Sequence, residues 1–170
     1  MKILTISGSS RIDSANTRLL KAIPKLVQHP TFEHFQDLNQ LPLFQAESDK
    51  HPWDKAVFAW RKAVSAADAV IISTPAYIYN MPALLKNALE WVTSSGELAQ
   101  KRVLVITFTP HPPRGEKAMQ SLLWSLQALE ANVVVQLPLY QNELTFGANG
   151  NILENESSEM LKEAIQLLIG

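Results

Sequence analysis

The sequence of 170 residues contains no cysteine, which excludes disulfide bonds, thiolate metal sites and a cysteine nucleophile. It also lacks an excess of charge of either sign: 15 Lys and Arg oppose 16 Asp and Glu, and the formal net charge is −1. No basic field is therefore present to attract nucleic acid or an anionic membrane surface, so we expect neither as a partner.

Long hydrophobic runs are missing as well, and none approaches the roughly 18 residues that a membrane-spanning helix requires. The opening apolar run, residues 3–6, is too short for a signal peptide and leads into a Ser-, Gly- and Arg-containing segment. Hydrophobic residues make up 46% and charged residues 18%, which is typical of a folded globular chain. We expect one soluble, cytoplasmic domain over residues 1–170.

Several enzyme motifs are absent. Without GxxxxGK[ST] there is no P-loop, and without GxGxxG there is no signature of a dinucleotide-binding Rossmann half. The sequence has no G-x-S-x-G nucleophile elbow and no pair of closely spaced carboxylates, so nothing in it indicates a hydrolase. The four histidines are not spaced as metal ligands, so no metal is expected; they are His29, His34, His51 and His111.

Short apolar runs alternate with segments of helical period along the whole chain. Strands are predicted at 3–6, 32–38, 69–73, 103–106 and 133–135, and helices at 16–28, 53–67, 82–94, 116–131 and around 161–168. Segment 32–38 alternates and is predicted at a sheet edge. Pro24 predicts a kink or an early end of the first helix.

This alternation is typical of a parallel sheet with helices on both faces. For five strands the leading topology is the doubly wound, flavodoxin-like order 2-1-3-4-5. Its ligand site lies beyond the carboxyl ends of the first, third and fourth strands.

The loop after the first strand is rich in hydroxyl, amide and cationic side chains: Ser9, Arg11, Ser14, Asn16 and Thr17. A phosphate there would meet backbone N–H groups, the positive end of a helix dipole and a planar cation. Capping a helix is the ordinary role of any one such side chain. Five together favour a phosphate-binding loop.

The loop after the third strand carries two tyrosines, Tyr77 and Tyr79, which can flank a flat ring or simply pack. Asn80 is predicted as the N-cap of the next helix and Pro82 as part of its first turn. The loop after the fourth strand, residues 107–115, contains three prolines, which make it stiff and remove backbone donors.

These segments resemble motifs of the NAD(P)H-dependent FMN reductase family. The pattern G-S-x-R-x-x-S-x-N-x-x-L is matched by Gly8, Ser9, Arg11, Ser14, Asn16 and Leu19. The pattern P-E-Y-N-x-S-x-P-G-x-L-K-N-A-x-D-W is matched by Pro75, Tyr77, Pro82, Leu85, Lys86, Asn87, Ala88 and Trp91. Leu41–Phe44 is similar to the family's "LPLF" stretch. The resemblance covers most of the chain.

The resemblance implies FMN as cofactor, NADPH or NADH as co-substrate, and a small acceptor such as a quinone, free flavin, metal oxyanion or azo compound. The expected FMN contacts are Ser9, Arg11, Ser14, Asn16, Thr17, Pro75, Ala76, Tyr77, Ile78, Tyr79, Asn80 and Thr109. No catalytic side chain is expected, because the isoalloxazine itself performs hydride chemistry. A homodimer or homotetramer is also implied, with Lys86, Asn87, Glu90 and Trp91 as anchor-like surface.

Three residues depart from the family pattern: Ala76 replaces Glu, Ile78 replaces Asn and Ala83 replaces Gly. The Pro-rich third loop also differs from the family's S-x-G-x-x-G-G type. These departures bear on substrate choice more than on FMN binding. Two other functions stay open at this point, a non-enzymatic flavin electron carrier or regulator and an enzyme acting on a phosphate ester.

Overall fold

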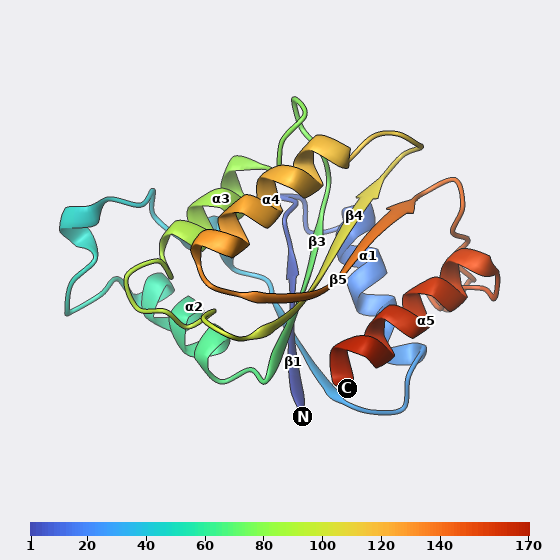
Figure 1. Ribbon diagram of the computed structural model, residues 1–170, viewed down its shortest axis with the longest axis horizontal. Helices are drawn as coiled ribbons and strands as arrows, with labels where there is room; N and C mark the ends of the chain where they lie inside the picture. Colours follow the sequence, from blue (N-terminus) through green and yellow to red (C-terminus); the bar gives the residue numbers. More distant parts are fainter.

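The computed structural model describes residues 1–170 as an α/β fold around one parallel sheet of five strands, in the order β2-β1-β3-β4-β5 (Figure 1). The strands are β1 Lys2–Ser7, β2 Thr31–Phe35, β3 Ala69–Thr74, β4 Arg102–Thr109 and β5 Asn132–Tyr140. The helices are α1 Ala15–Ala22, α2 Lys55–Ser65, α3 Ala83–Glu90, α4 Glu116–Ala128 and α5 Glu156–Ile169. The predicted fold class and strand order are confirmed.

Helices cover both faces of the sheet (Figure 1). On one face α2, α3 and α4 pack against strand residues such as Val70 and Ile72. On the other face α1 and α5 pack against the alternating neighbours Ala69 and Ile71. Because both faces of β3 are buried, the strand is a continuous apolar run. None of the helices combines the length and hydrophobicity needed to cross a lipid bilayer.

Several element ends differ from the prediction. Helix α1 stops at Ala22, and Pro24 lies in a 3₁₀ turn, Ile23–Lys25, so the early end is confirmed. Strand β2 lies at the edge as predicted but ends at Phe35. Strand β5 runs on to Tyr140 through Gln136 and Pro138, well past the predicted end at residue 135. An edge strand tolerates Pro138, because one side of its backbone needs no ladder partner, and the Gln136 side chain is exposed.

The long connection between β2 and α2 is held against α3. The side chains of Asn87 and Trp91 both donate to the carbonyl of Pro42, at 3.0 and 2.8 Å. The N–H of Phe44 donates to Asn87 Oδ1 at 2.8 Å, and its ring packs edge-on against Trp91. Asn87 and Trp91 are buried. The expectation that they form exposed anchor-like surface is therefore wrong.

The same connection is also fixed by a buried ion cluster. Arg61 on α2 bonds Asp49 and Glu97, each at 2.8 Å, with little solvent exposure of any partner. Its guanidinium also lies 3.8 Å from the centre of the Trp53 ring. The connection between β2 and α2, with Asp49 and Trp53, and the segment after α3, with Glu97, thus converge on one cation. By contrast, Lys86 and Glu90 pair with each other on the exposed side of α3.

Candidate functional site

Hydroxyl groups give the β1–α1 loop its shape. Ser14 caps α1 by accepting from the Thr17 N–H at 3.0 Å. The Ser14 and Thr17 hydroxyls lie 2.9 Å apart, and Thr17 Oγ1 also donates to Ser7 Oγ at 3.1 Å. Ser9 Oγ accepts from the N–H of Arg11. The buried hydroxyls therefore bond to the loop itself and hold it in a fixed conformation.

Backbone donors in this loop are left without partners. The N–H groups that have no acceptor within the protein are those of Ser10, Ile12, Asp13, Ala15 and Asn16. The last two open the first turn of α1, where the helix dipole adds positive potential. The Arg11 side chain is exposed beside them. Such a set of donors fits a phosphate group.

Asn16 lies in this loop, but its side chain bonds elsewhere. Its Nδ2 donates to the carbonyl of Phe108 at 3.2 Å, and its Oδ1 accepts from Ser73 Oγ at 2.7 Å. The residue is buried. Asn16 therefore links the start of α1 to the ends of β3 and β4, and its backbone N–H is the part that belongs to the group of unpaired donors.

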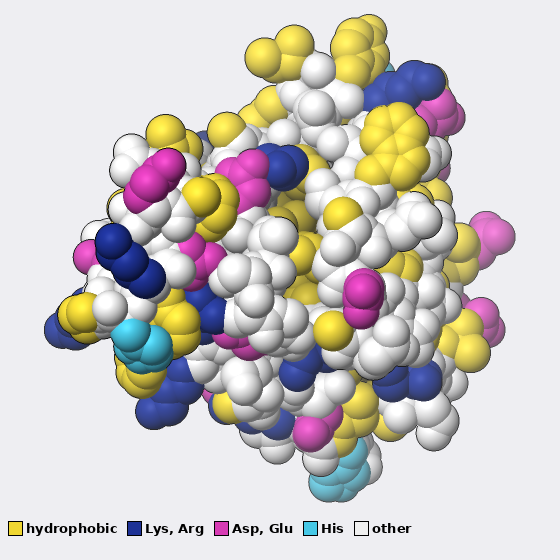
Figure 2. Space-filling model, turned by 60° about the vertical axis from the view of Figure 1, so that its left-hand side comes forward, with side chains coloured by type: hydrophobic (Ala, Val, Ile, Leu, Met, Phe, Trp, Pro, Cys, Tyr) yellow, Lys and Arg dark blue, Asp and Glu magenta, His cyan; other side chains and the backbone are white.

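The β3–α3 loop forms a tight turn. The backbones of Tyr77 and Asn80 exchange two hydrogen bonds of 2.9 Å, and Ile78 and Tyr79 between them have φ angles of 51° and 59°. Positive φ at both central residues is the pattern of a type I′ turn. A β-branched residue in that region is strained. The turn projects at the top of Figure 1, and Figure 2 shows hydrophobic side chains protruding there.

The predicted capping role of Asn80 is wrong. Its Oδ1 accepts from the N–H of Met81 at 2.8 Å, and the N-cap of α3 is Pro82, without a capping side chain. Asn80 instead closes the hairpin with Tyr77 through two backbone hydrogen bonds, and it lies two residues before the cap. In the sequence a helix cap and a turn residue look alike.

A cavity of about 510 Å³ lies between the β3–α3 and β4–α4 loops. Its lining includes Ala76, Ile78 and Tyr79 from the first of these loops and His111 and Arg114 from the second. The volume lies within the range of roughly 300–1,000 Å³ that is usual for ligand pockets. The N–H of Ala76 and those of Gly115, Glu116 and Lys117 have no acceptor within the protein. They fit the polar edge of a flat ring.

Close packing of the loops depends on two glycines. A Cβ on Gly8 would lie 2.8 Å from Thr74 Oγ1, so only glycine lets the first loop approach the end of β3. Gly115 has a φ of 105°, and a Cβ there would lie 3.0 Å from Thr107 Oγ1. Thr109 is buried and donates to the carbonyl of Arg114 at 2.8 Å. Its hydroxyl thus closes the third loop.

The structure brings the predicted residues together at one edge of the sheet, in two groups. Those of the first loop surround the unpaired donors. Of those after β3 and β4, Ala76, Ile78 and Tyr79 border the cavity, and Pro75, Tyr77, Asn80 and Thr109 do not.

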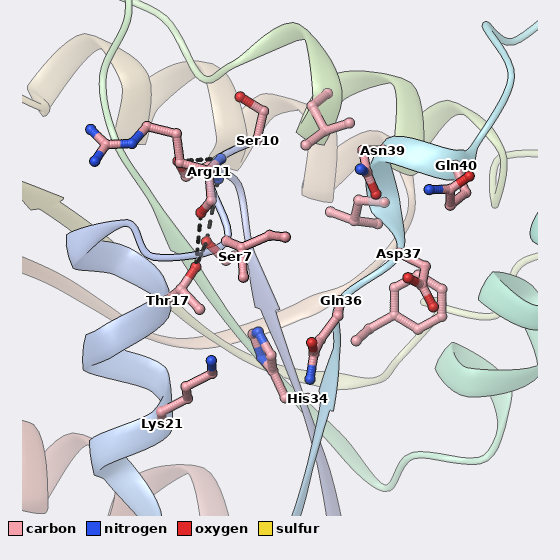
Figure 3. A pocket seen from close by; sticks show the side chains of 15 residues that line it. Ser7, Ser10, Arg11, Thr17, Lys21, His34, Gln36, Asp37, Asn39 and Gln40 are labelled. Carbon is pink, nitrogen blue, oxygen red and sulfur yellow. Dashed lines mark hydrogen bonds between the residues drawn. The ribbon is translucent and has the colours of Figure 1, made fainter. Parts of the chain in front are cut away.

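The first loop, with Ser9, Arg11 and Thr17, also lines a polar pocket at the ends of β1 and β2 (Figure 3). Sequence reasoning missed two of its lining residues, Lys21 and His34. The available signal for Lys21 was its position one turn after Thr17 on the same helix.

His34 has a perturbed titration. Burial, and secondarily the positive charge of Lys21, lowers the pKa of His34, although its hydrogen bond to Thr5 opposes the shift. The ring Nδ1 lies 2.9 Å from Thr5 Oγ1, which itself donates to the carbonyl of Glu33. The Thr5 hydroxyl thus links the His34 ring to the backbone of β2.

Residues 1–142 match the model of the NADPH-dependent FMN reductase family. The chain belongs to this family. The match includes all three ligand-side loops, so the family resemblance of the first two loops is confirmed. No curated protein sequence matches the chain.

Solved structures share the fold of this family member. The flavoenzyme NAD(P)H:(acceptor) oxidoreductase from Paracoccus denitrificans has a TM-score of 0.81 and 20% identity, covering 99% of this chain and 95% of its own. An apo NADH:FMN oxidoreductase has a TM-score of 0.76 and 20% identity, covering 98% and 87%. General stress protein 14 of Treponema denticola, in complex with FMN, has a TM-score of 0.61 and 13% identity, covering 99% and 97%.

Proposed function

We propose that the protein is an FMN-dependent oxidoreductase that takes hydride from NADPH or NADH and passes electrons to a small acceptor. A quinone, free flavin, metal oxyanion or azo compound has the required chemistry. The observation that carries this proposal is the set of unpaired N–H groups at the start of α1, next to a ring-sized cavity at the ends of β3 and β4. The N–H groups suit the phosphate of a mononucleotide, and the neighbouring cavity suits its flat ring.

The first loop would hold the phosphate through its backbone donors, with Ser9 and Arg11 adding a hydroxyl and a cation. Ser14 and Thr17 would keep the loop in shape, since their hydroxyls already bond each other. The first-turn N–H groups of α1 place a positive field on the anion.

The ring of FMN would lie in the cavity between the β3–α3 and β4–α4 loops. The Ala76 N–H and the first-turn donors of α4 would meet its polar edge, while Tyr79 would border its exposed side. When bound, FMN supplies the hydride chemistry, and the protein supplies position and electrostatics. We therefore assign no general acid or base to this chain.

Titration of apo-protein with FMN and with riboflavin tests the phosphate assignment. Hydrogen bonds to charged groups contribute about 1.5–3 kcal/mol each, so FMN should bind at least roughly a hundredfold more tightly than riboflavin. Ser9→Ala and Arg11→Ala should reduce that ratio by about tenfold each while leaving riboflavin affinity unchanged. Equal affinity for FMN and riboflavin would contradict the assignment.

A panel of acceptors added to the NADPH-reduced protein tests the second half-reaction. Fast reoxidation by at least one quinone, flavin, oxyanion or azo compound supports a reductase. Reoxidation only by another electron-transfer protein would instead favour a carrier, and the absence of flavin binding would favour a phosphate-ester enzyme.

We also propose a homodimer or homotetramer. The support is the exposure of large apolar side chains that have no partner within the chain: Ile78 at 97%, Tyr79 at 84% and Trp124 at 64%. Light scattering at micromolar concentration should give at least twice the mass of one chain. A monomer under those conditions would contradict the proposal.

A further inference from the structure

The rim of the ring cavity carries more positive than negative charge. Its charged side chains are those of Arg114 and Lys117, opposed by Glu116, while His111 is neutral. The three charged side chains are exposed, and none of them takes part in an ion pair of the structure. Two positive charges against one negative charge give the rim a net charge of +1, whereas the whole chain has −1. Such a rim raises the local concentration of anionic ligands.

The stability of α4 does not explain these two cations. Lys117 lies in the first turn of α4, and Arg114 lies two residues before the helix begins at Glu116. The helix dipole makes this end positive, so anions are stabilised there and cations are destabilised. A bound anion would relieve this repulsion. The placement of the two cations is therefore better explained by a ligand than by the fold.

The third loop holds Arg114 by its backbone and leaves its side chain available. The Arg114 N–H donates to the carbonyl of His111 at 3.1 Å, and the Arg114 carbonyl accepts from Thr109 Oγ1 at 2.8 Å. The base of the side chain is thus fixed at the rim, while the guanidinium has no carboxylate partner. A guanidinium presents a planar fork of donors that can bind two oxygens of one anionic group.

The facing wall of the cavity is uncharged and mainly apolar. The β3–α3 loop contributes Ala76, Ile78 and Tyr79 to the lining, and the last two side chains are almost fully exposed. Figure 2 shows Lys or Arg side chains beside the hydrophobic side chains at the top of the molecule. A flat aromatic ligand would cover this apolar surface, whereas a small inorganic anion would leave it in water. The two walls together favour an aromatic ligand with an anionic substituent.

We propose that the electron acceptor is a planar aromatic molecule carrying a sulfonate or carboxylate group, with Arg114 binding that group and Tyr79 contacting the ring. This inference rests on the proposed function. For a quinone of this kind, NAD(P)H and one proton give the hydroquinone and NAD(P)⁺, so two electrons are transferred. The anionic substituent is unchanged by the reaction and acts only in binding. Lys117 adds to the positive field beside the guanidinium.

The pyrophosphate of the nicotinamide nucleotide is the competing anion for Arg114, and kinetics separate the two. If Arg114 contacts the pyrophosphate, its loss raises the KM for NADPH and for NADH, whichever acceptor is used. If Arg114 contacts the acceptor, its loss lowers kcat/KM for anionic acceptors and leaves neutral ones unaffected.

The variant Arg114→Gln tests the proposal, because it removes the guanidinium and keeps both backbone hydrogen bonds. Lys55→Gln is the control for net charge, since Lys55 is exposed, unpaired and outside the cavity lining. The acceptors are a naphthoquinone sulfonate and the neutral methylnaphthoquinone. Comparing each variant with wild type cancels the difference in reduction potential between the two quinones.

Arg114→Gln should lower kcat/KM for the sulfonate roughly tenfold and leave the neutral quinone within about twofold, because one charged hydrogen-bonded contact is lost. Lys117→Gln should lower the value for the sulfonate by about two- to threefold, as expected for an exposed charge. Lys55→Gln should change neither value. Added salt should slow wild type with the sulfonate more than it slows Arg114→Gln, because salt screens the rim charge.

Calorimetric titration of the oxidised, FMN-loaded protein gives a readout without turnover. Wild type should bind an anthraquinone sulfonate more tightly than a neutral hydroxymethylanthraquinone, and Arg114→Gln should lose that preference. Equal losses for both naphthoquinones would overturn the proposal. A raised KM for both nucleotides with an unchanged acceptor ratio would also overturn it and assign Arg114 to the nucleotide. If neither nucleotide reduces wild-type flavin, the proposed function fails, whereas the titration still decides whether the cavity prefers an anionic aromatic ligand.

Discussion

Asn16, at the start of α1, donates a hydrogen bond to the carbonyl of Phe108 near the end of β4, 92 residues away in the sequence. The same side chain accepts a hydrogen bond from Ser73 on β3. One buried carboxamide therefore sets the relative positions of the first and third ligand-side loops. Changes at Asn16 should alter both stability and cofactor affinity.

We expect Asn16→Ala to lower the free energy of unfolding by about 1–3 kcal/mol, because two buried partners lose their hydrogen bonds. FMN affinity should fall roughly tenfold, because the β1–α1 loop moves relative to the ring cavity. Ser73→Ala, which removes one of the same bonds, should give a smaller change in both quantities. Urea unfolding and FMN titration check this. A normal stability for Asn16→Ala, with a large loss of FMN, would show that the side chain contacts the phosphate directly.

Position 76 separates a backbone role from a side-chain role. The N–H of Ala76 has no acceptor, so Ala76→Pro should weaken FMN by several-fold to a hundredfold, on the order of 1–3 kcal/mol. Ala76→Glu keeps the donor and should leave FMN affinity within a few-fold. The added carboxylate should slow anionic acceptors selectively. The opposite order of the two variants in FMN titrations would contradict the proposed ring contact.

The Arg61 cluster should contribute strongly to stability. Arg61→Ala leaves the Asp49 and Glu97 carboxylates buried without their cation, and breaking a buried pair costs about 3–5 kcal/mol. Lys86→Ala removes an exposed helical pair and should cost less than about 0.5 kcal/mol. Denaturant unfolding compares the two variants. Equal losses would show that burial of the cluster is unimportant.

His34 should make stability depend on pH in mild acid. Its pKa is lower in the folded than in the unfolded chain, so the unfolded chain binds more protons between the two values. Stability from this group is present above the unfolded pKa and is lost as the pH falls through the window below it. His34→Gln should flatten this part of the pH profile. An identical acid slope in wild type and variant would contradict the assignment.

Much of the fold could be predicted from local patterns. The central strand β3 was recognisable because burial on both faces makes it uniformly apolar, and the alternation of strands and helices indicated the sheet order. The end of β5 was not recognisable, since Pro138 has no backbone N–H and is tolerated because the strand lies at an edge. The order of the strands can thus be inferred from the sequence, but the length of an edge strand cannot.

The candidate site was predictable as a set of loops but not as a set of contacts. The hydrogen-bond partners of Asn16 lie on two strands, β3 and β4. No local sequence pattern predicts a hydrogen bond between residues 92 positions apart. The motif residues Asn87 and Trp91 suggested an interface, yet they hold Pro42. Pro42 belongs to the LPLF stretch, so two motifs that are distant in sequence are linked by hydrogen bonds. Only the tertiary structure shows that link.

Anaerobic mixing of the FMN-loaded protein with one equivalent of NADPH or NADH tests the central claim most directly. The account predicts loss of the visible absorption of the oxidised flavin within the turnover time with at least one of the two nucleotides, and recovery when an acceptor is added. A protein that binds FMN at the loops described but whose flavin stays oxidised with both nucleotides would contradict it.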